Sequence, residues 1–326
     1  MPHERYITIS LAPREIARYR WLNLAFGAIH GCANLAVLLL LPLLIRFDIL
    51  GFHLSWFLLG LPVALLSNGF WALQHEAFHN HFAATQATNK LCGRLMSILF
   101  GSSFRVLRFA HLMHHRFNRH PLDRPDTFDP DTTPAWRARG LFFAEILGGL
   151  YLIEIISPLL YCLPQQAVRR LLDRIYAGED SRLTQLRQLA QQTLGSSRAI
   201  AEVRQDVVAV LLLYGLAFGL WGGWWWGLLA FILIRAVLIS FLDNVYHFRT
   251  PVDRPDFAYN LCLSAPLRAL IFNMNFHRIH HHHMHLPWWA LPRQFQLSGE
   301  TFDQGYFHAA IAQFRGPAPT GMLGSD

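Results

Sequence analysis

The apolar positions of this chain are gathered in long runs. The first run spans Trp21–Ile45 and the second spans Leu54–Gln74. Each is long enough to cross a hydrocarbon layer of about 30 Å as a helix. The link between them, Arg46–Asp48, is short and polar, so we expect the two runs to form a transmembrane hairpin.

A second hairpin is predicted late in the chain. One apolar run covers Val207–Trp221 and the next covers Trp224–Leu242. Gly222 and Gly223 lie between them and favour a tight turn. Tryptophans flank this turn, and tryptophan is enriched at the interface between membrane and water.

A fifth apolar run, Leu141–Leu163, contains Glu145, Glu154 and Pro158. The segment after it is rich in arginine, and such segments stay on the cytoplasmic side of a membrane. If the run crossed, the last histidine cluster would lie on the opposite side from the other clusters. We therefore expect this run to be interfacial or re-entrant.

These patterns predict an all-α integral membrane protein with four transmembrane helices in two hairpins, at about residues 21–74 and 207–246. A helical cap, about 75–204 and 247–326, is expected on the cytoplasmic side together with both termini. The polar residues 1–20 do not have the pattern of a cleavable signal peptide. We expect one domain, residues 1–326, in the cytoplasmic membrane.

Composition supports a membrane protein and excludes other classes. Of the 326 residues, 53% are hydrophobic and only 15% are charged, against about a quarter in soluble domains. The net charge of +7 comes almost entirely from arginines, because Lys90 is the single lysine. These arginines are spread between apolar runs, so nucleic-acid binding is not expected. The four cysteines form no CxxC pair, so neither a zinc ribbon nor a disulfide framework is predicted.

Three clusters account for many of the 18 histidines. They are HEAFHNH at 75–81, HLMHH at 111–115 and NFHRIHH at 275–281. Spacings of three and four residues place histidines on one face of a helix. A further histidine, His247, follows the end of the last apolar run.

The clusters indicate a metal centre. Neutral imidazole is a good ligand for iron, zinc, copper or nickel. Eight histidines of the three motifs have these spacings, and together with His247 they are too many for one ion, whereas two ions with four or five ligands each would use them. Dioxygen chemistry is the usual reason to hold two irons together at the edge of a lipid phase.

The motifs resemble those of the membrane fatty acid desaturase and hydroxylase superfamily, whose members are non-haem di-iron oxidases. HEAFHNH is similar to the first histidine box, HLMHH to the second and NFHRIHH to the third. Asp123, Asp126 and Asp131 resemble the acidic stretch after the second box, and Pro287–Pro292 resembles the tail after the third. The resemblance covers roughly residues 75–292.

The resemblance implies two iron ions, with dioxygen as co-substrate. It also implies a histidine ligand at the end of the fourth transmembrane helix, where His247 lies. The implied ligands, which are also the implied catalytic residues, are His75, His79, His111, His114, His115, His247, His277, His280 and His281.

Other polar residues are assigned supporting roles. His282, His283 and His285 extend the third box beyond the HxxHH register, so we place them outside the ligand set, with His282 as a neighbour of the ligands. His81 faces away from His75 unless the helix ends near His79. Asp243, Asn244 and Asn275 are further candidates for contact with the ligands or for orienting a helix end.

Arg235 lies in the middle of an apolar run, where a charge costs a few kcal/mol. One interpretation is an ion pair with Glu145, Glu154 or Asp243. The alternative is that Arg235 binds the carboxylate of a substrate.

Two rival classes compete with the oxidase. HEAFH matches HExxH, in which two histidines bind zinc and the glutamate acts as a base in metalloproteases. That class leaves at least six clustered histidines unexplained. A non-enzymatic metal-binding membrane protein would spread its ligands through the membrane depth, whereas these lie in one predicted layer. A soluble carboxylate-bridged di-iron bundle needs two Glu-x-x-His pairs, and only one is present.

The resemblance therefore implies an oxidase that attacks a C–H bond of a fatty acid or other lipid-like acyl chain, with desaturation the commonest outcome. Oxidative decarboxylation of a free fatty acid to a terminal alkene, hydroxylation and ketolation stay open. Because His120-Pro121 is not followed by Gly-Gly, no fused cytochrome b5 is evident. We expect a separate electron donor, a ferredoxin or similar carrier with its reductase, attracted by Arg116, Arg119 and Arg124.

Overall fold

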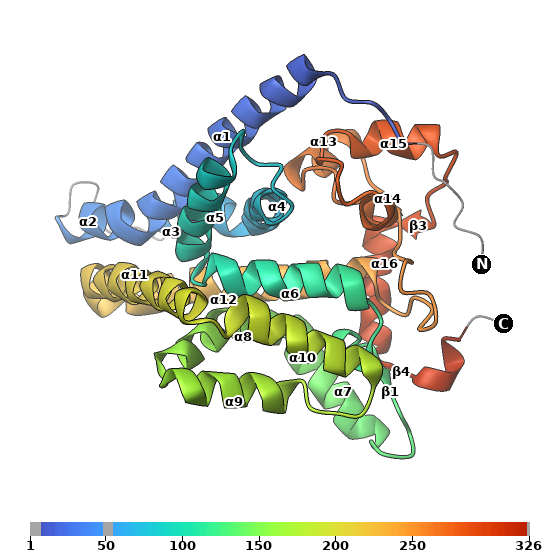
Figure 1. Cartoon of the computed structure of the whole chain (residues 1–326). Coiled ribbons are helices and arrows are strands. Elements are labelled where there is room, and N and C mark those ends of the chain that lie inside the picture. The colour runs from blue at the N-terminus through green and yellow to red at the C-terminus, as the bar shows by residue number, and fades with distance from the viewer. Residues whose placement is uncertain (1–7, 48–54, 325–326) are drawn as a thin grey trace.

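The computed structural model describes residues 8–47 and 55–324 and is almost entirely helical (Figure 1). The prediction of an all-α protein is confirmed. The α-helices are α1 Pro13–Leu35, α2 Leu41–Arg46, α3 Ser55–Leu65, α4 Ser67–Phe78, α5 Gln86–Phe100, α6 Phe104–Phe117, α7 Ala135–Ala144, α8 Leu150–Ile156, α9 Gln165–Ile175, α10 Ser181–Leu194, α11 Ser197–Trp221, α12 Trp225–Asp243, α13 Ala265–Leu270, α14 His277–His282, α15 Leu291–Leu297 and α16 Tyr306–Ala312.

Short irregular elements connect these helices. Two π-helical turns occupy Ala36–Leu40 and Glu145–Gly149. The 3₁₀ turns are Pro121–Asp123, Ser157–Cys162, Gly222–Trp224, Asn244–Tyr246, Gln313–Arg315 and Thr320–Met322. Four two-residue strands pair in parallel, β1 Thr127–Phe128 with β4 Ala318–Pro319 and β2 Leu261–Cys262 with β3 Gln304–Gly305. The first pair attaches the C-terminal segment to the loop that follows α6.

Three described stretches are long and apolar enough to cross a membrane: Pro13–Arg46, Ala135–Cys162 and Ser197–Tyr246. The first contains the predicted run 21–45, with a π-helical turn just before Pro42, whose missing N–H interrupts the regular hydrogen-bond ladder. The third contains both runs of the predicted late hairpin.

The turn of the late hairpin lies where it was predicted. Gly222 has φ +50°, which residues with a side chain rarely adopt. The predicted break at the glycines is therefore present between α11 and α12, and Arg235 of α12 lies 3.4 Å from the Tyr214 hydroxyl of α11.

The predicted single run Leu54–Gln74 is divided. It forms α3 and α4, which are separated at Leu66, and neither piece alone is long enough to be among the three candidate spans. The predicted hairpin link lies partly outside the described residues, because residues 48–54 are not described. Gly69 of α4 lies against the backbone carbonyl of Leu270, and a side chain there would overlap that carbonyl.

The segment predicted as interfacial or re-entrant is not a continuous helix. Leu147 and Gly148 leave helical geometry, with φ +130° at Gly148, and Pro158 lies at the start of the 3₁₀ turn Ser157–Cys162. Gly148 contacts Ala236, so the interruption lies against α12.

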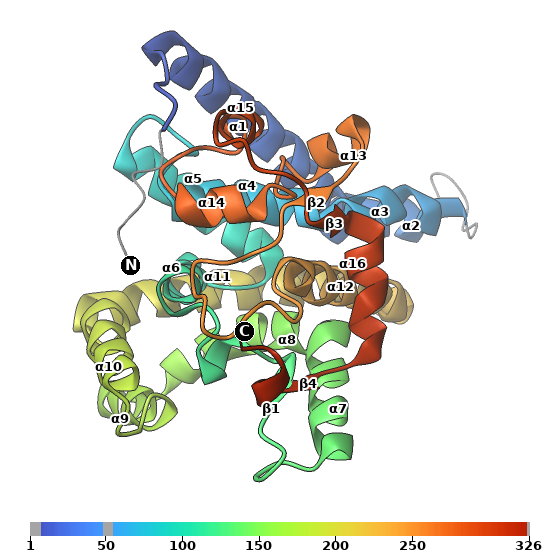
Figure 2. The ribbon, with the colours of Figure 1, turned by 90° about the vertical axis from the view of Figure 1, so that its right-hand side faces the viewer.

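The helices lie in layers that both views show. One layer contains α1, α3, α4 and α5, and the next contains α6, α11 and α12 (Figures 1 and 2). The helices α7 to α10 lie on the outer side of the second layer, and α13 to α16 cover one side of the first two. Aromatic side chains of α4, α5 and α6 fill the core between the layers, among them Phe70, Phe78, Phe100 and Phe104.

The helical pair α9–α10 supports α6. Val168 and Leu172 of α9 and Leu186 of α10 are buried against Phe109 and Phe117 of α6. Removing this apolar surface from water stabilises the contact. The helix that carries the second histidine cluster therefore rests on a packed base.

A buried ion pair joins the loop after α6 to the segment after α12. The Arg119 guanidinium donates to Asp126 at 2.7 and 3.1 Å and also to the carbonyl oxygens of His247 (3.2 Å) and Thr250 (2.9 Å). Arg119 is 2% exposed and Asp126 is fully buried. The prediction that Arg119 attracts an electron donor is wrong, because this cation is buried and its charge is already paired.

The Arg235 ion pair predicted from the sequence is also wrong. The Arg235 guanidinium donates to Asn34 Oδ1 on α1, to Leu99 O at 3.3 Å and to the Tyr214 hydroxyl at 3.4 Å. No carboxylate among the described residues forms an ion pair with it. These neutral acceptors bind the two terminal nitrogens of the guanidinium and connect α12 with α1, α5 and α11.

The buried pair predicts a large stability effect. Asp126→Asn leaves Arg119 as an uncompensated buried charge, which costs about 3–5 kcal/mol. We expect a clear fall in the midpoint of unfolding of the purified protein in detergent. Asp256→Asn is the matched control, because Asp256 and Arg254 are half exposed and 3.6 Å apart; its cost is below about 1 kcal/mol. Equal effects of the two substitutions would contradict the role of the buried pair.

Candidate metal centre

Four parts of the chain bring histidines to one place. His75 lies on α4, and His79 follows the end of that helix. The helix α6 carries His111, His114 and His115, and α14 carries His277, His280 and His281. His247 follows the 3₁₀ turn after α12. The three clusters and His247, separated by up to about 200 positions in sequence, therefore converge.

Five of these histidines form a first group. Their ring nitrogens all lie within 4.8 Å of one another. The Nε2 atoms of four pairs are 2.9 Å apart, and these pairs connect the rings into one cluster. The members are His75, His79, His111, His115 and His280.

The other four form a second group by the same criterion: His114, His247, His277 and His281. The Nε2 atom of His247 lies 3.1 Å from the Nε2 atoms of both His114 and His277. The ring nitrogens point inward, as they do in the first group.

The HxxHH spacing distributes ligands between the two groups. On α6 the i and i+4 residues, His111 and His115, belong to the first group and His114 to the second. On α14 the assignment is reversed, since His277 and His281 belong to the second group and His280 to the first. The groups are neighbours, with the His115 and His281 ring centroids 4.4 Å apart. The motif therefore builds two adjacent sites from two helices.

Burial favours the neutral form of these rings. Desolvation lowers the pKa of His79 to about 3, and it lowers the pKa of His111, His280 and His281 well below the usual range. A neutral imidazole presents a lone pair, which is the form that binds a cation.

His114 differs from its neighbours. Desolvation lowers its pKa, but the Asp123 carboxylate, 2.8 Å from its Nδ1 atom, outweighs this effect and the net pKa is raised. A carboxylate on the outer nitrogen fixes the orientation of a ligating ring and increases its basicity. Asp123, known from the sequence only as part of an acidic stretch, therefore orients a member of the second group.

The donor set fits transition-metal ions. His281 Nε2 is buried and has no hydrogen-bond partner among the described residues. Such an atom is costly in an apolar interior unless a cation or a donor faces it. Imidazole nitrogens suit iron, zinc and copper, and two ions with five and four histidines account for the whole set. Among the described residues, neither group includes a carboxylate.

The residues predicted to flank the ligands lie outside both groups. The His81 ring nitrogen is 4.0 Å from Glu76, and α4 does end just before His79. Asn244 donates to Gln313 (2.7 Å) and Asn275 donates to the Leu261 carbonyl (2.9 Å). His282 lies 3.7 and 3.8 Å from the carboxylates of Asp256 and Glu300.

The two histidines that follow lie farther along the same segment. The His283 Nδ1 atom lies 3.4 Å from the Thr8 hydroxyl and its Nε2 atom lies 3.3 Å from Gln294. His285 is exposed. Neither belongs to a histidine group.

Two small cavities adjoin the histidines. The first, of about 130 Å³, has apolar walls from Trp71, Phe78, Leu107, Ala110 and Leu150 and reaches members of both groups. The second, of about 140 Å³, has Asp123, Glu145 and Asp243 beside His114 and His247. The first is also lined by three carboxylates, those of Asp123, Glu154 and Asp243. Asp123 and Asp243 line both cavities.

One connection escaped the sequence analysis. Asn23 of α1 accepts a hydrogen bond from the Trp288 indole at 2.9 Å and donates to the carbonyl oxygens of His81 and Phe82. The Trp288 backbone N–H in turn donates to Glu76 at 3.2 Å. Asn23 therefore connects the segments next to the first and third clusters. The available signal was a polar residue inside an apolar run, which is often functional in membrane helices.

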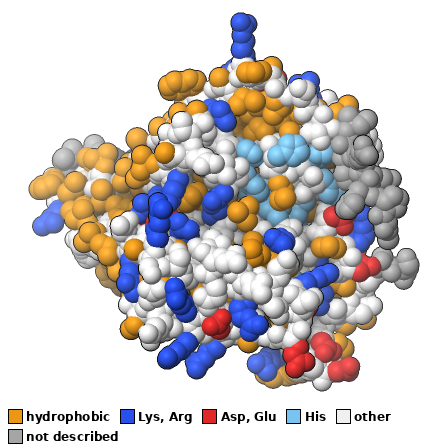
Figure 3. Space-filling model, in the orientation of Figure 1, with side chains coloured by type: hydrophobic (Ala, Val, Ile, Leu, Met, Phe, Trp, Pro, Cys, Tyr) orange, Lys and Arg blue, Asp and Glu red, His pale blue; other side chains and the backbone are white. Residues whose placement is uncertain are grey.

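The surface reflects this arrangement. In Figure 3 histidine side chains form a single patch, bordered by apolar and basic side chains. Apolar side chains gather at the left end, where Figure 1 places α2 and one end of α11. Exposed apolar residues of this kind include Leu211 and Leu212 of α11. An exposed apolar surface such as this one, away from the histidine patch, suits contact with lipid.

Comparison with known proteins agrees with this geometry. The profile of the fatty acid desaturase family matches residues 51–310, well over half of the chain, and this range contains all nine histidines of the two groups. The curated proteins and the solved structures compared with the chain gave no match. The profile match over residues 51–310 shows that the chain belongs to the fatty acid desaturase family.

Proposed function

We propose that this protein is a dioxygen-dependent di-iron oxidase of fatty acyl chains, and specifically a desaturase that introduces a C=C bond. The observation that carries the proposal is the convergence of nine histidines in two adjacent groups beside an apolar cavity. Membership of the family supports an oxidoreductase with an acyl substrate.

The nine histidines would hold the iron, five at one site and four at the other. Bound there, iron supplies the redox chemistry with dioxygen that breaking an unactivated C–H bond requires. Desaturation removes two hydrogens from adjacent carbons and, with two electrons and two protons from outside, reduces dioxygen to two waters.

The side chains of this protein supply placement. Trp71, Phe78, Leu107 and Leu150 form apolar walls against which methylene groups pack beside the histidines. Apolar walls also exclude water from the reacting carbon. Asp123 keeps the His114 ring turned toward its group.

The protease interpretation loses support at Glu76. A protease of the HExxH class needs this carboxylate as a base beside the metal. Here Glu76 accepts the Trp288 N–H and lies next to His81, outside both histidine groups. Burial raises the pKa of Glu76 to about 8, so its neutral form is favoured at neutral pH.

We propose four membrane crossings, as the sequence predicts. The His114 and His247 Nε2 atoms are 3.1 Å apart, so an even number of crossings separates them. The hairpin of α11 and α12 supplies two, which leaves Ala135–Cys162 on one side. Tyr19, before the first apolar run, stacks on Trp289 at 4.1 Å, close to the third cluster. The chain therefore begins and ends the first hairpin, α1–α2 and α3–α4, on the side of the membrane that holds the histidines.

The arginine-rich residues 164–204 favour the cytoplasmic side for the histidines and for both termini. We therefore propose an integral protein of the cytoplasmic membrane whose whole chain, 1–326, forms one domain. The membrane-spanning hairpins anchor it, and the remaining helices form the cap around the metal centre.

Two electrons per turnover must come from a separate carrier such as a ferredoxin. Arg116 is exposed and follows His115 directly, and Arg124 is partly exposed. These two cations, without Arg119, form the proposed attraction for an acidic carrier.

The reaction is tested with membranes that contain the protein, a reductase system and a series of deuterated fatty acids. We expect oxygen-dependent formation of an internal alkene with loss of two deuterium atoms, read by mass spectrometry. A terminal alkene one carbon shorter would make the protein a decarboxylase, and an alcohol or ketone would make it a hydroxylase or ketolase. Peptide cleavage without oxygen consumption would contradict the oxidase proposal.

The donor site is tested by charge reversal. Arg116→Glu is expected to lower the turnover rate about tenfold at low salt with a ferredoxin donor, and the difference shrinks as salt screens the attraction. Arg170→Glu, an exposed change on α9, serves as the control and keeps the wild-type rate. An Arg116→Glu rate equal to wild type at every salt concentration would contradict the proposed docking site.

A further inference from the structure

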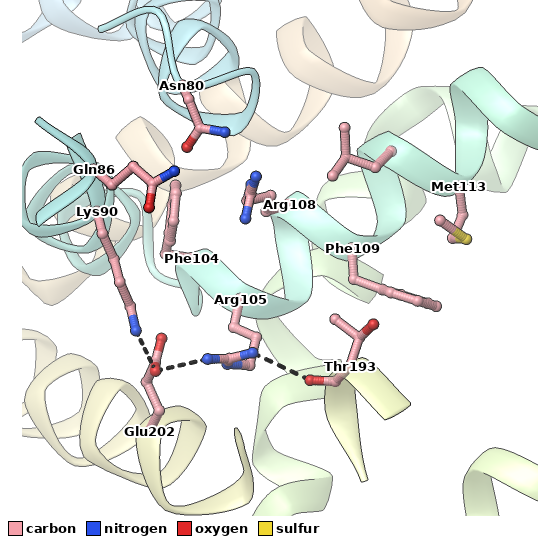
Figure 4. Close-up of a pocket in the computed structure, with 11 residues that line it drawn as sticks. Asn80, Gln86, Lys90, Phe104, Arg105, Arg108, Phe109, Met113, Thr193 and Glu202 are labelled. Carbon is pink, nitrogen blue, oxygen red and sulfur yellow. Dashed lines mark hydrogen bonds and ion pairs between the residues drawn. The ribbon is translucent and has the colours of Figure 1, made fainter. Parts of the chain in front are cut away.

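A pocket of about 280 Å³ opens next to the metal centre but does not include the histidines. It lies among α5, α6, α10 and α11 (Figure 4). The face of α6 that lines it carries Phe104, Arg105, Arg108 and Phe109. Leu107, His111 and His114 face the apolar cavity instead, so α6 separates the two spaces.

The pocket has an excess of positive charge. Lys90 and Arg105 both contact the same oxygen of Glu202, at 2.5 and 2.8 Å (Figure 4). Arg108, the third cation, has no carboxylate partner among the described residues. One carboxylate facing three cations leaves two positive charges in a concave site.

Arg108 is held in position and still has donors to offer. Its Nε atom donates to the Phe78 carbonyl at 2.8 Å, and this is the hydrogen bond that fixes the side chain. Its two terminal nitrogens have no protein acceptor among the described residues. Figure 4 shows the guanidinium directed into the pocket, with the amides of Asn80 and Gln86 on the same side. A guanidinium with two free nitrogens matches a carboxylate or phosphate in a bidentate contact.

The pocket lies next to the reacting side of the protein. Arg108 is one helical turn before His111, and its anchor Phe78 precedes His79. The Phe78 and Phe104 rings, 5.7 Å between centroids, form the wall shared with the apolar cavity. Phe104 reaches this position because Gly93 of α5 has no side chain to block it.

We propose that this pocket binds the anionic head of the acyl substrate, with Arg108 as its main contact. The head is a carboxylate, or a phosphate of the coenzyme A or phospholipid to which the acyl chain is attached. The acyl identity of the ligand rests on the proposed function, whereas the oxyanion site rests on the pocket itself. Lys90 and Arg105 add charge, and Phe104 and Phe109 contact the first apolar atoms beyond the head. The same charge would reject a neutral fatty alcohol or ester.

Equilibrium binding to the purified, iron-loaded protein tests this without turnover. The probes are a long-chain fatty acid, its coenzyme A thioester, a phosphatidic acid and the fatty alcohol of the same length. We expect Arg108→Gln to weaken binding of at least one anionic probe about tenfold, the effect of losing one charge-assisted contact, and to leave the alcohol unchanged. Arg198→Gln, an exposed arginine on α11 outside the pocket, is the charge-matched control and binds like wild type.

The anionic probe that responds identifies the source of the head group, free acid, thioester or phospholipid. Lys90 gives a second readout, because it is the single lysine of the chain and its side chain is 41% exposed. The binding probe should protect Lys90 from acetylation by an amine-reactive reagent, as read by mass spectrometry, and the alcohol should not. Equal losses for acid and alcohol, or no loss for any anionic probe, would overturn the pocket proposal. Failure of the desaturase proposal would be seen separately, as absence of product from the wild type.

Discussion

The structure depends on keeping nine imidazole rings together in an apolar interior. Their inward nitrogens lie as close as 2.9 Å to one another, and burial favours the neutral form of the rings except at His114, whose pKa Asp123 raises. Neighbouring rings packed in this way cannot all form hydrogen bonds with one another. The lone pairs of adjacent nitrogens repel unless a cation or a shared proton lies between them. The site is therefore organised for metal before metal binds, and the surrounding helices must hold the rings in place.

Several contacts outside the histidine groups provide that support. The Arg119–Asp126 pair ties the loop after α6 to the backbone of His247, and α9 and α10 pack behind α6. Asn23 and Trp288 join α1 to the segments next to the first and third clusters. Each contact connects parts of the chain that are distant in sequence, so the membrane-embedded helices and the metal centre are stabilised together.

The sequence was most informative where a local spacing determines the geometry. Spacings of three and four residues placed the histidines of α6 and of α14 on one face of each helix, because helical periodicity fixes those faces. How each HxxHH motif divides its histidines between the two groups was visible only in the fold. Tertiary partners were not predictable in this way. Arg119 follows a histidine box like a surface cation, and only the fold shows Asp126 closing over it. Arg235 was assigned acidic partners because a cation in an apolar run is often paired with an anion. In the fold, the neutral side chains of Asn34 and Tyr214, both in apolar helices, accept its hydrogen bonds. The separation of α3 from α4 at Leu66 was also not predicted, because the nearest helix-breaking proline in the sequence is Pro62, four residues earlier.

The central claim is that histidines alone hold two irons. X-ray absorption at the iron K-edge of the purified protein tests it most directly. The account predicts an iron edge and a nearest shell dominated by nitrogen, with the outer scattering of four to five imidazole rings per iron. An edge from a single zinc ion, or an iron shell of sulfur ligands or of carboxylate oxygens without imidazole, would contradict it.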